Sequence, residues 1–250
     1  LAKWVAEIDN IERLPEYISR AFSVALSGRP GPVILSLPEN ILFAKTNVPD
    51  APKVNPPKQM VSKEDVTEVI GKLKRAKTPF IIVGGSGWSS DAAGNLGEFA
   101  KSLGIPVGTS FRCQDYLDNR HPNYVGDVGI GINPALLSRI KLSDCVLVLN
   151  ARLGEMTTGG YSMFDIPKTK QYLIHIHPDP NELGRVYQPD IGLVCNSAEF
   201  VKKAVSISKE YQNKSPTKER ESYEAWQKPL TTPGNVKMEV IIKKLSDTMP

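Results

Sequence analysis

The chain has 250 residues, 40% of them hydrophobic, and its 31 basic and 27 acidic side chains leave a net charge of +4. This size and composition are ordinary for a globular protein with one sizeable core and flanking segments, and no aromatic or groove-reading pattern accompanies the charge to indicate nucleic-acid binding. No apolar run approaches the ~18 residues that cross a bilayer and no stretch has a signal-peptide pattern, so we predict a cytoplasmic location without a membrane partner.

The first forty residues predict a helix followed by a strand. Apolar side chains recur every three or four positions over residues 11–26, which indicates an amphipathic helix that Gly28 stops. The apolar run 33–37, closed by Pro38, predicts a buried strand. Prolines then recur without periodicity over residues 44–60, which predicts an extended linker and a domain boundary.

Beyond the linker, predicted strands and helices alternate. Ser62 is a candidate cap for a helix with an apolar face of valine, isoleucine and leucine. The following strands are expected at residues 80–83, 105–109, 145–149, 172–177 and 191–195, with helices at 91–103, 134–140 and 198–207. This alternation predicts an α/β fold with a Rossmann-like doubly wound parallel sheet from about residue 61 to 207, in which ligands bind at the carboxyl ends of the strands.

The first such strand end carries the turn Gly84-Gly85-Ser86-Gly87, which precedes a predicted helix. Small residues there would let backbone N–H groups approach a phosphate. The turn falls short of the dinucleotide fingerprint, because Ser90 stands where a third glycine would be and no acidic residue follows about twenty positions later. Two interpretations stay open: a nucleotide contact, and a tight turn between a strand and a helix.

Arg152 follows the predicted strand 145–149 and would project into the same crevice. A guanidinium at that place could clamp a phosphate or stack on a flat ring. The alternative is that Arg152 pairs with Glu155 or Asp165 and fastens a loop. The small residues at 157–160 then form either a ligand cover or a simple connection.

The sequence contains no pattern that indicates a metal site or a catalytic nucleophile. His175 and His177 point to one face of a strand, but no further ligand has suitable spacing, so we expect hydrogen-bonded histidines and no metal site. We expect a loop at residues 126–131. The three cysteines, Cys113, Cys145 and Cys195, are predicted to be buried free thiols. With no nucleophile elbow either, the chain shows no catalytic residues of its own.

The run AFSVALSGRPGPVILSLP at residues 21–38 resembles the end of the pyrimidine-binding domain of thiamine-diphosphate enzymes such as acetolactate synthases. The proline-rich linker, the sequences FIIVGG (80–85), NAR (150–152) and HIHPDPNELG (175–184) follow in the order of that family's central domain, and the last fifteen residues resemble the lead helix of its diphosphate-binding domain. This similarity divides the chain into residues 1–43 from the first domain, the linker 44–60, the central domain 61–207, a connector 208–235 and the start of the last domain, 236–250.

The resemblance implies an enzyme of three α/β domains, dimeric or tetrameric, that uses thiamine diphosphate and magnesium as a lyase or carboligase (a transferase) on a 2-oxo acid. The residues that bind the cofactor and metal would precede Leu1 and follow Pro250, so the isolated segment is expected to be inactive and to serve as scaffold and subunit contact. The alternatives are a free-standing module that binds FAD or ADP, and a structural domain with a vacant crevice.

In acetolactate synthases the central domain holds FAD, and the resemblance assigns its contacts here to Gly84, Gly85, Gly87, Thr109 and Arg152. Two positions depart from the family pattern. His177 stands where an acidic residue would hold the ribose, and Cys195-Asn196 replaces a Gly-Asp pair. These changes remove acceptors for ribose hydroxyls. Two interpretations therefore stay open: a central domain that holds FAD or ADP, and one that holds neither.

Overall fold

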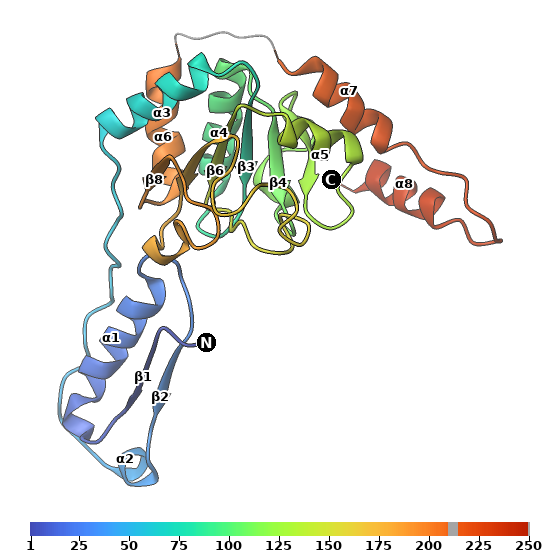
Figure 1. Cartoon of the computed structure of the whole chain (residues 1–250). Coiled ribbons are helices and arrows are strands. Elements are labelled where there is room, and N and C mark those ends of the chain that lie inside the picture. The colour runs from blue at the N-terminus through green and yellow to red at the C-terminus, as the bar shows by residue number, and fades with distance from the viewer. Residues whose placement is uncertain (210–214, 250) are drawn as a thin grey trace.

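A parallel sheet of six strands forms the centre of the computed structural model, which describes residues 1–209 and 215–249 (Figure 1). The strand order is β5-β4-β3-β6-β7-β8, and every neighbouring pair is parallel. The chain runs outward from β3 to one edge and returns to build the other half from β6, so the order reverses between β3 and β6. The strands are β3 (Pro79–Val83), β4 (Val107–Ser110), β5 (Tyr124–Val128), β6 (Cys145–Leu149), β7 (Tyr172–Ile176) and β8 (Ile191–Leu193).

Helices cover both faces of this sheet, which confirms the doubly wound fold. One face carries α3 (Lys63–Arg75), α4 (Ser90–Leu103) and α6 (Ser197–Ser208), whose apolar side chains share a core with alternate residues of the strands. The opposite face is covered by α5 (Pro134–Lys141) together with side chains from the segment 151–164. Because both faces are buried, β3, β4 and β6 consist of almost uninterrupted small or apolar residues.

Local sequence signals fix several helix ends in this domain. The Ser62 side chain accepts a hydrogen bond from the Asp65 backbone N–H, as the predicted cap requires. Helix α4 ends at Gly104, which adopts the left-handed conformation with φ of 64°. Most predicted strand and helix boundaries lie within two residues of those in the structure.

The expected loop at residues 126–131 is partly wrong, because its first half belongs to strand β5. Gly126 and Asp127 interrupt the apolar pattern that identifies a buried strand, and Gly126 has a φ of 117°, with a bulge in the pairing to β4 nearby. Strand β5 is the edge of the sheet, and helix α7 (Thr217–Trp226) packs over it. The Tyr223 ring of α7 meets the Tyr124 ring edge to face, with centroids 5.1 Å apart.

Residues 1–43, called the N-terminal unit below, contain a separate pair of parallel strands (Figure 1). Strand β2 was expected to be buried, yet Ile34 is 55% exposed, because only one face of the pair is covered by helix α1. The unit is joined to α3 by the extended segment 44–60, as the prolines predict. Its elements are β1 (Trp4–Glu7), η1 (Ile11–Arg13), α1 (Leu14–Leu26), β2 (Val33–Ser36) and α2 (Glu39–Phe43).

The predicted connector, residues 208–235, contains a helix. Residues 210–214 of the predicted connector lie outside the described residues, but α7 follows them and buries Tyr223. The helix expected near the end of the chain is α8 (Met238–Thr248), and two short 3-10 helices, η2 (Gln114–Tyr116) and η3 (Pro180–Glu182), lie in loops. Among the described helices, none has the length and apolarity to span a membrane.

Candidate functional site

The candidate site lies where the strand order reverses, at the carboxyl ends of β3 and β6. Val83 pairs with Leu149 in register, so the glycine turn and the segment beginning at Asn150 leave the sheet side by side. The Gly84 N–H donates to the Leu149 carbonyl at 3.0 Å, which continues the ladder by one residue. Open α/β sheets bind ligands at this position.

Side chains hold the glycine turn from three directions. The Trp88 indole N–H donates to the Gly84 carbonyl at 2.8 Å, and the Tyr116 hydroxyl donates to the Gly85 carbonyl at 2.5 Å. The Asn150 side-chain amide donates to the Ser86 carbonyl at 2.7 Å. These bonds occupy the carbonyls of the turn. The N–H groups of Gly85, Ser86 and Gly87, in contrast, donate to no protein acceptor within the described residues and remain open to an anion.

Close packing explains the glycine at two of these positions. A Cβ on Gly84 would lie 2.0 Å from the Ser110 hydroxyl oxygen, and one on Gly85 would lie 2.1 Å from the Asn150 carbonyl oxygen. Gly85 also has a φ of 74°, which side chains disfavour. The tight-turn interpretation therefore accounts for Gly84 and Gly85 without a ligand.

Asn150 ties the ends of several elements together and was not singled out from the sequence. It adopts the left-handed conformation, with φ of 54°, and is buried. Its side-chain oxygen accepts hydrogen bonds from the Ser197 N–H at 3.2 Å and the Ser197 hydroxyl at 2.7 Å. An asparagine directly after a fully apolar strand was the available signal, because asparagine tolerates this backbone conformation better than most residues.

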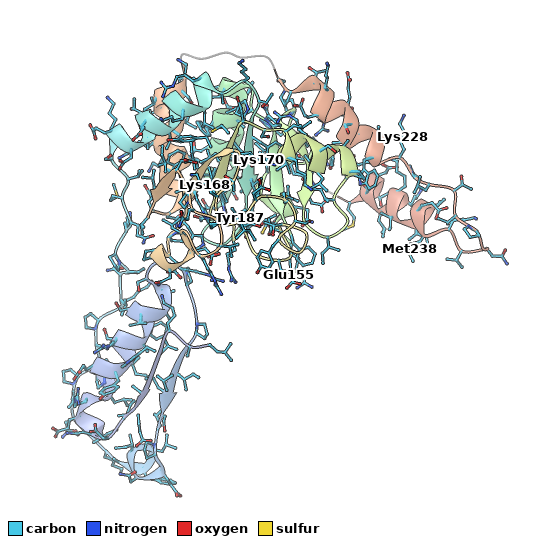
Figure 2. The ribbon with its side chains drawn as sticks, in the orientation of Figure 1. Glu155, Lys168, Lys170, Tyr187, Lys228 and Met238 are labelled. Atoms are coloured by element: carbon cyan, nitrogen blue, oxygen red, sulfur yellow. The ribbon has the colours of Figure 1, made fainter. Side chains whose placement is uncertain are left out.

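Arg152 is 44% exposed and is held by a buried carboxylate. Its Nε donates to Glu182 Oε2 at 3.1 Å, while the Glu182 side chain is only 7% exposed and also lies 3.6 Å from the Arg185 guanidinium. The expected partners Glu155 and Asp165 are wrong: Asp165 pairs with Lys170 at 3.2 Å, and Figure 2 shows Glu155 at the outer rim. Arg152 therefore does form an ion pair, as the alternative interpretation proposed, but with a different partner, and 44% of its side-chain surface is still exposed.

Thr109 differs from the other predicted contacts because its side chain is fully buried. Its hydroxyl lies 3.4 Å from the Tyr124 hydroxyl, on the face of the sheet that α3, α4 and α6 cover. The structure gives this side chain a packing role, and a cofactor contact by Thr109 remains a prediction from the family resemblance.

His175 in β7 and His177, just after the strand, are hydrogen-bonded, and burial favours their neutral forms. His175 Nε2 donates to the Ala151 carbonyl at 2.9 Å, and burial lowers the pKa of His175 to about 4. His177 Nδ1 accepts from the Asp179 N–H at 3.0 Å, and burial lowers the pKa of His177 as well. No group of three potential metal ligands occurs among the described residues.

The three cysteines are buried free thiols, as predicted. Burial raises the pKa of Cys145 and of Cys195 to about 12, which keeps both thiols protonated near neutral pH. Neither is suited to act as a nucleophile.

The positions that would hold the ribose of a dinucleotide do not fit that group. His177 is 2% exposed, and its Nδ1 is already occupied by the Asp179 N–H. Asn196 caps helix α6, because its side-chain oxygen accepts from the Ala198 N–H at 2.9 Å. The acceptors that ribose hydroxyls need are therefore engaged within the protein.

Comparison with known proteins gives the family. Residues 66–204 match the family described as thiamine pyrophosphate enzyme, central domain. The acetolactate synthase large subunit of Corynebacterium glutamicum is 27% identical over 206 residues, which cover 81% of this chain and 32% of that protein. Glyoxylate carboligase of Escherichia coli O157:H7 is 27% identical (85% and 36% covered), and the mitochondrial acetolactate synthase catalytic subunit of Saccharomyces cerevisiae is 29% identical (98% and 39% covered).

The chain thus spans about a third of the length of these curated relatives. The matched residues begin inside α3 and end inside α6, so they include all six strands of the central sheet and the point between β3 and β6 where the strand order reverses. The chain belongs to the thiamine pyrophosphate enzyme family and contains its central domain.

Proposed function

We propose that this chain is the central segment of a thiamine-diphosphate-dependent enzyme that makes or breaks carbon–carbon bonds in 2-oxo acids. The observation that carries this proposal is the family match over the whole central sheet. The names of the relatives support a carboligase, since they include acetolactate synthases and a glyoxylate carboligase. Whether the enzyme is a transferase or a lyase depends on the acceptor that it uses.

Within such an enzyme, we assign this segment the role of a scaffold. Thiamine diphosphate supplies the electron sink for reactions at the carbonyl carbon. No cluster of three potential metal ligands occurs among the described residues. We assign the magnesium and diphosphate sites to other parts of the enzyme and expect the segment alone to be inactive. We further propose that the chain divides into the linker, the central domain and the flanking segments given above. The full enzyme is proposed to be a cytoplasmic homodimer or homotetramer.

The crevice keeps one candidate binding function. We propose that the open N–H groups of the turn hold a small anionic group, with the exposed Arg152 side chain as a second candidate contact, although the ribose positions argue against FAD or ADP. Calorimetric titration with inorganic phosphate, ADP and FAD tests this assignment. Binding that is lost in Arg152→Ala supports the site, whereas no heat from any of the three ligands removes it.

The test of the enzyme function is an assay of the natural gene product that carries this sequence. We expect it to consume pyruvate or glyoxylate only when thiamine diphosphate and magnesium are both present. Consumption that does not depend on added thiamine diphosphate after its removal by dialysis would contradict the proposal, as would failure with every 2-oxo acid tried. The 250-residue chain alone is the inactive control.

A further inference from the structure

Residues 178–182, called the bracket segment below, bind the linker at one end and lie close to the N-terminal unit there. The Pro178 carbonyl accepts a hydrogen bond from the Gln59 side-chain amide at 2.8 Å. The same carbonyl lies against Gly28, where an added Cβ would be 3.4 Å away. A single backbone oxygen thus binds the end of the linker and lies close to the loop after α1.

The other end of the bracket segment touches the crevice. Glu182, the last residue of the segment, holds the guanidinium of Arg152 at 3.1 Å. Its carboxylate is buried, so the position of the ion pair depends on where the segment places it. Only three residues, 179–181, therefore separate the Pro178 contact from the Glu182 ion pair.

The bracket segment is built to be stiff. Two of its five residues are prolines, whose φ angles are fixed by their rings. The Asp179 N–H is held by His177 Nδ1, and the Asp179 carboxylate accepts from the Asn181 N–H at 3.0 Å. The Glu182 N–H closes a turn on the Asp179 carbonyl at 3.2 Å. A segment with few free torsions moves as one body when either end is displaced.

We propose that the bracket segment couples the Arg152–Glu182 ion pair in the crevice to the seating of the N-terminal unit on the central domain. Glu182 is the positioning residue at the Arg152 end. At the other end, the hydrogen bond from Gln59 to the Pro178 carbonyl, called the seat below, holds the linker. Any process that engages the guanidinium of Arg152 then changes how firmly the N-terminal unit is held. This coupling is a property of the fold and does not depend on an anion binding in the crevice.

Limited trypsin digestion of the chain tests the coupling. Lys58 is exposed and precedes Gln59, so cleavage after Lys58 reports release of the seat, and cleavage after Lys101 in α4 reports opening of the central domain. We expect Gln59→Ala to raise cleavage after Lys58, relative to Lys101, about fivefold, the effect of losing one hydrogen bond. Glu182→Gln should raise it in the same direction, although it leaves the seat residues unchanged.

Two comparisons make the result decisive. Lys170→Ala removes an exposed ion pair elsewhere and should leave cleavage after Lys58 unchanged. In the double variant Gln59→Ala/Glu182→Gln, relative cleavage after Lys58 should exceed that of the more affected single variant by less than twofold. Equal cleavage in Glu182→Gln and Lys170→Ala would overturn the proposal, and so would a double effect equal to the product of the single effects. Should Glu182→Gln lack native circular dichroism, Arg152→Gln, at a half-exposed position, is judged by the same criteria.

Discussion

The side-chain amide of Asn150 and the carbonyl of Ser86 are joined by a hydrogen bond of 2.7 Å across the ends of β6 and β3. This bond links the two halves of the sheet at the point where the strand order reverses. Because the side-chain oxygen of Asn150 also holds Ser197 at the start of α6, one residue joins the ends of β6 and β3 to the start of α6.

We expect Asn150→Ala to lower the free energy of unfolding by about 2–4 kcal/mol, since it removes these buried hydrogen bonds and places alanine in the left-handed conformation. Asn150→Gly also removes the side chain but tolerates the backbone conformation. Urea unfolding should therefore find the glycine variant about 1 kcal/mol more stable than the alanine variant. Equal stability of the two would show that backbone strain at this position is negligible.

Gly84→Ala should destabilise the protein by about 1–3 kcal/mol, because its Cβ would lie 2.0 Å from the Ser110 hydroxyl oxygen. Adding Ser110→Ala should recover part of the loss in chemical denaturation, since the nearest clashing atom is then gone. Gly94→Ala is the matched control: it lies on α4 with open space around it, and we expect a gain of about 0.5–1 kcal/mol. A neutral Gly84→Ala would contradict the packing explanation of this glycine.

Stability should fall on mild acidification because of the buried histidines. The pKa of His175 is about 4 in the folded protein against 6.5 for an unperturbed histidine, so between these values only the unfolded chain binds the proton. The contribution of His175 to the free energy of unfolding is fully present above pH 6.5. It is lost as the pH falls toward 4, by about 3 kcal/mol in total. The lowered pKa values of His121 and His177 act in the same direction.

Urea unfolding at pH 7.5 and pH 5 measures this loss. His175→Gln can still donate to the Ala151 carbonyl but does not titrate, so its stability should change less between the two pH values. A pH dependence identical to that of the wild-type chain would assign the effect to other groups.

Cys145 and Cys195 should be unreactive in the folded protein. With a pKa of about 12, the thiolate fraction at pH 8 is about a thousandfold below that of an ordinary thiol, and both sulfurs are buried. In a Cys113→Ser variant, which retains only these two cysteines, we expect Ellman's reagent to react at the rate of unfolding. Rapid labelling of native protein would show that one of the thiols is accessible.

The sequence is sufficient to predict the sheet domain because its strands are apolar runs and its helices have clear caps such as Ser62. It is not sufficient for β5, whose Gly126 and Asp127 interrupt the apolar pattern, nor for β1, which is too short to show a period. The turn at Gly84 was located, but the atoms that exclude a side chain there come from Ser110, a contact that only the folded chain creates.

The same limit applies to the candidate site. Spacing places Arg152 at a strand end, yet its partner Glu182 lies thirty residues further along the chain and reaches it through the turn η3. Local spacing suggested Glu155 instead. Long-range ion pairs depend on loop conformation, which residue patterns describe poorly.

Helix α7 has a consequence for the behaviour of the protein in concentrated solution. An uncovered edge strand offers its backbone groups to other chains and is a starting point for aggregation. Tyr223 packs against Tyr124 and Arg220 donates to the Tyr124 carbonyl at 3.2 Å, so α7 shields β5, whereas the opposite edge, β8, has only three residues. The α7 segment therefore covers this edge, and we expect a version of the central domain that stops at residue 209 to expose the longer edge to its neighbours.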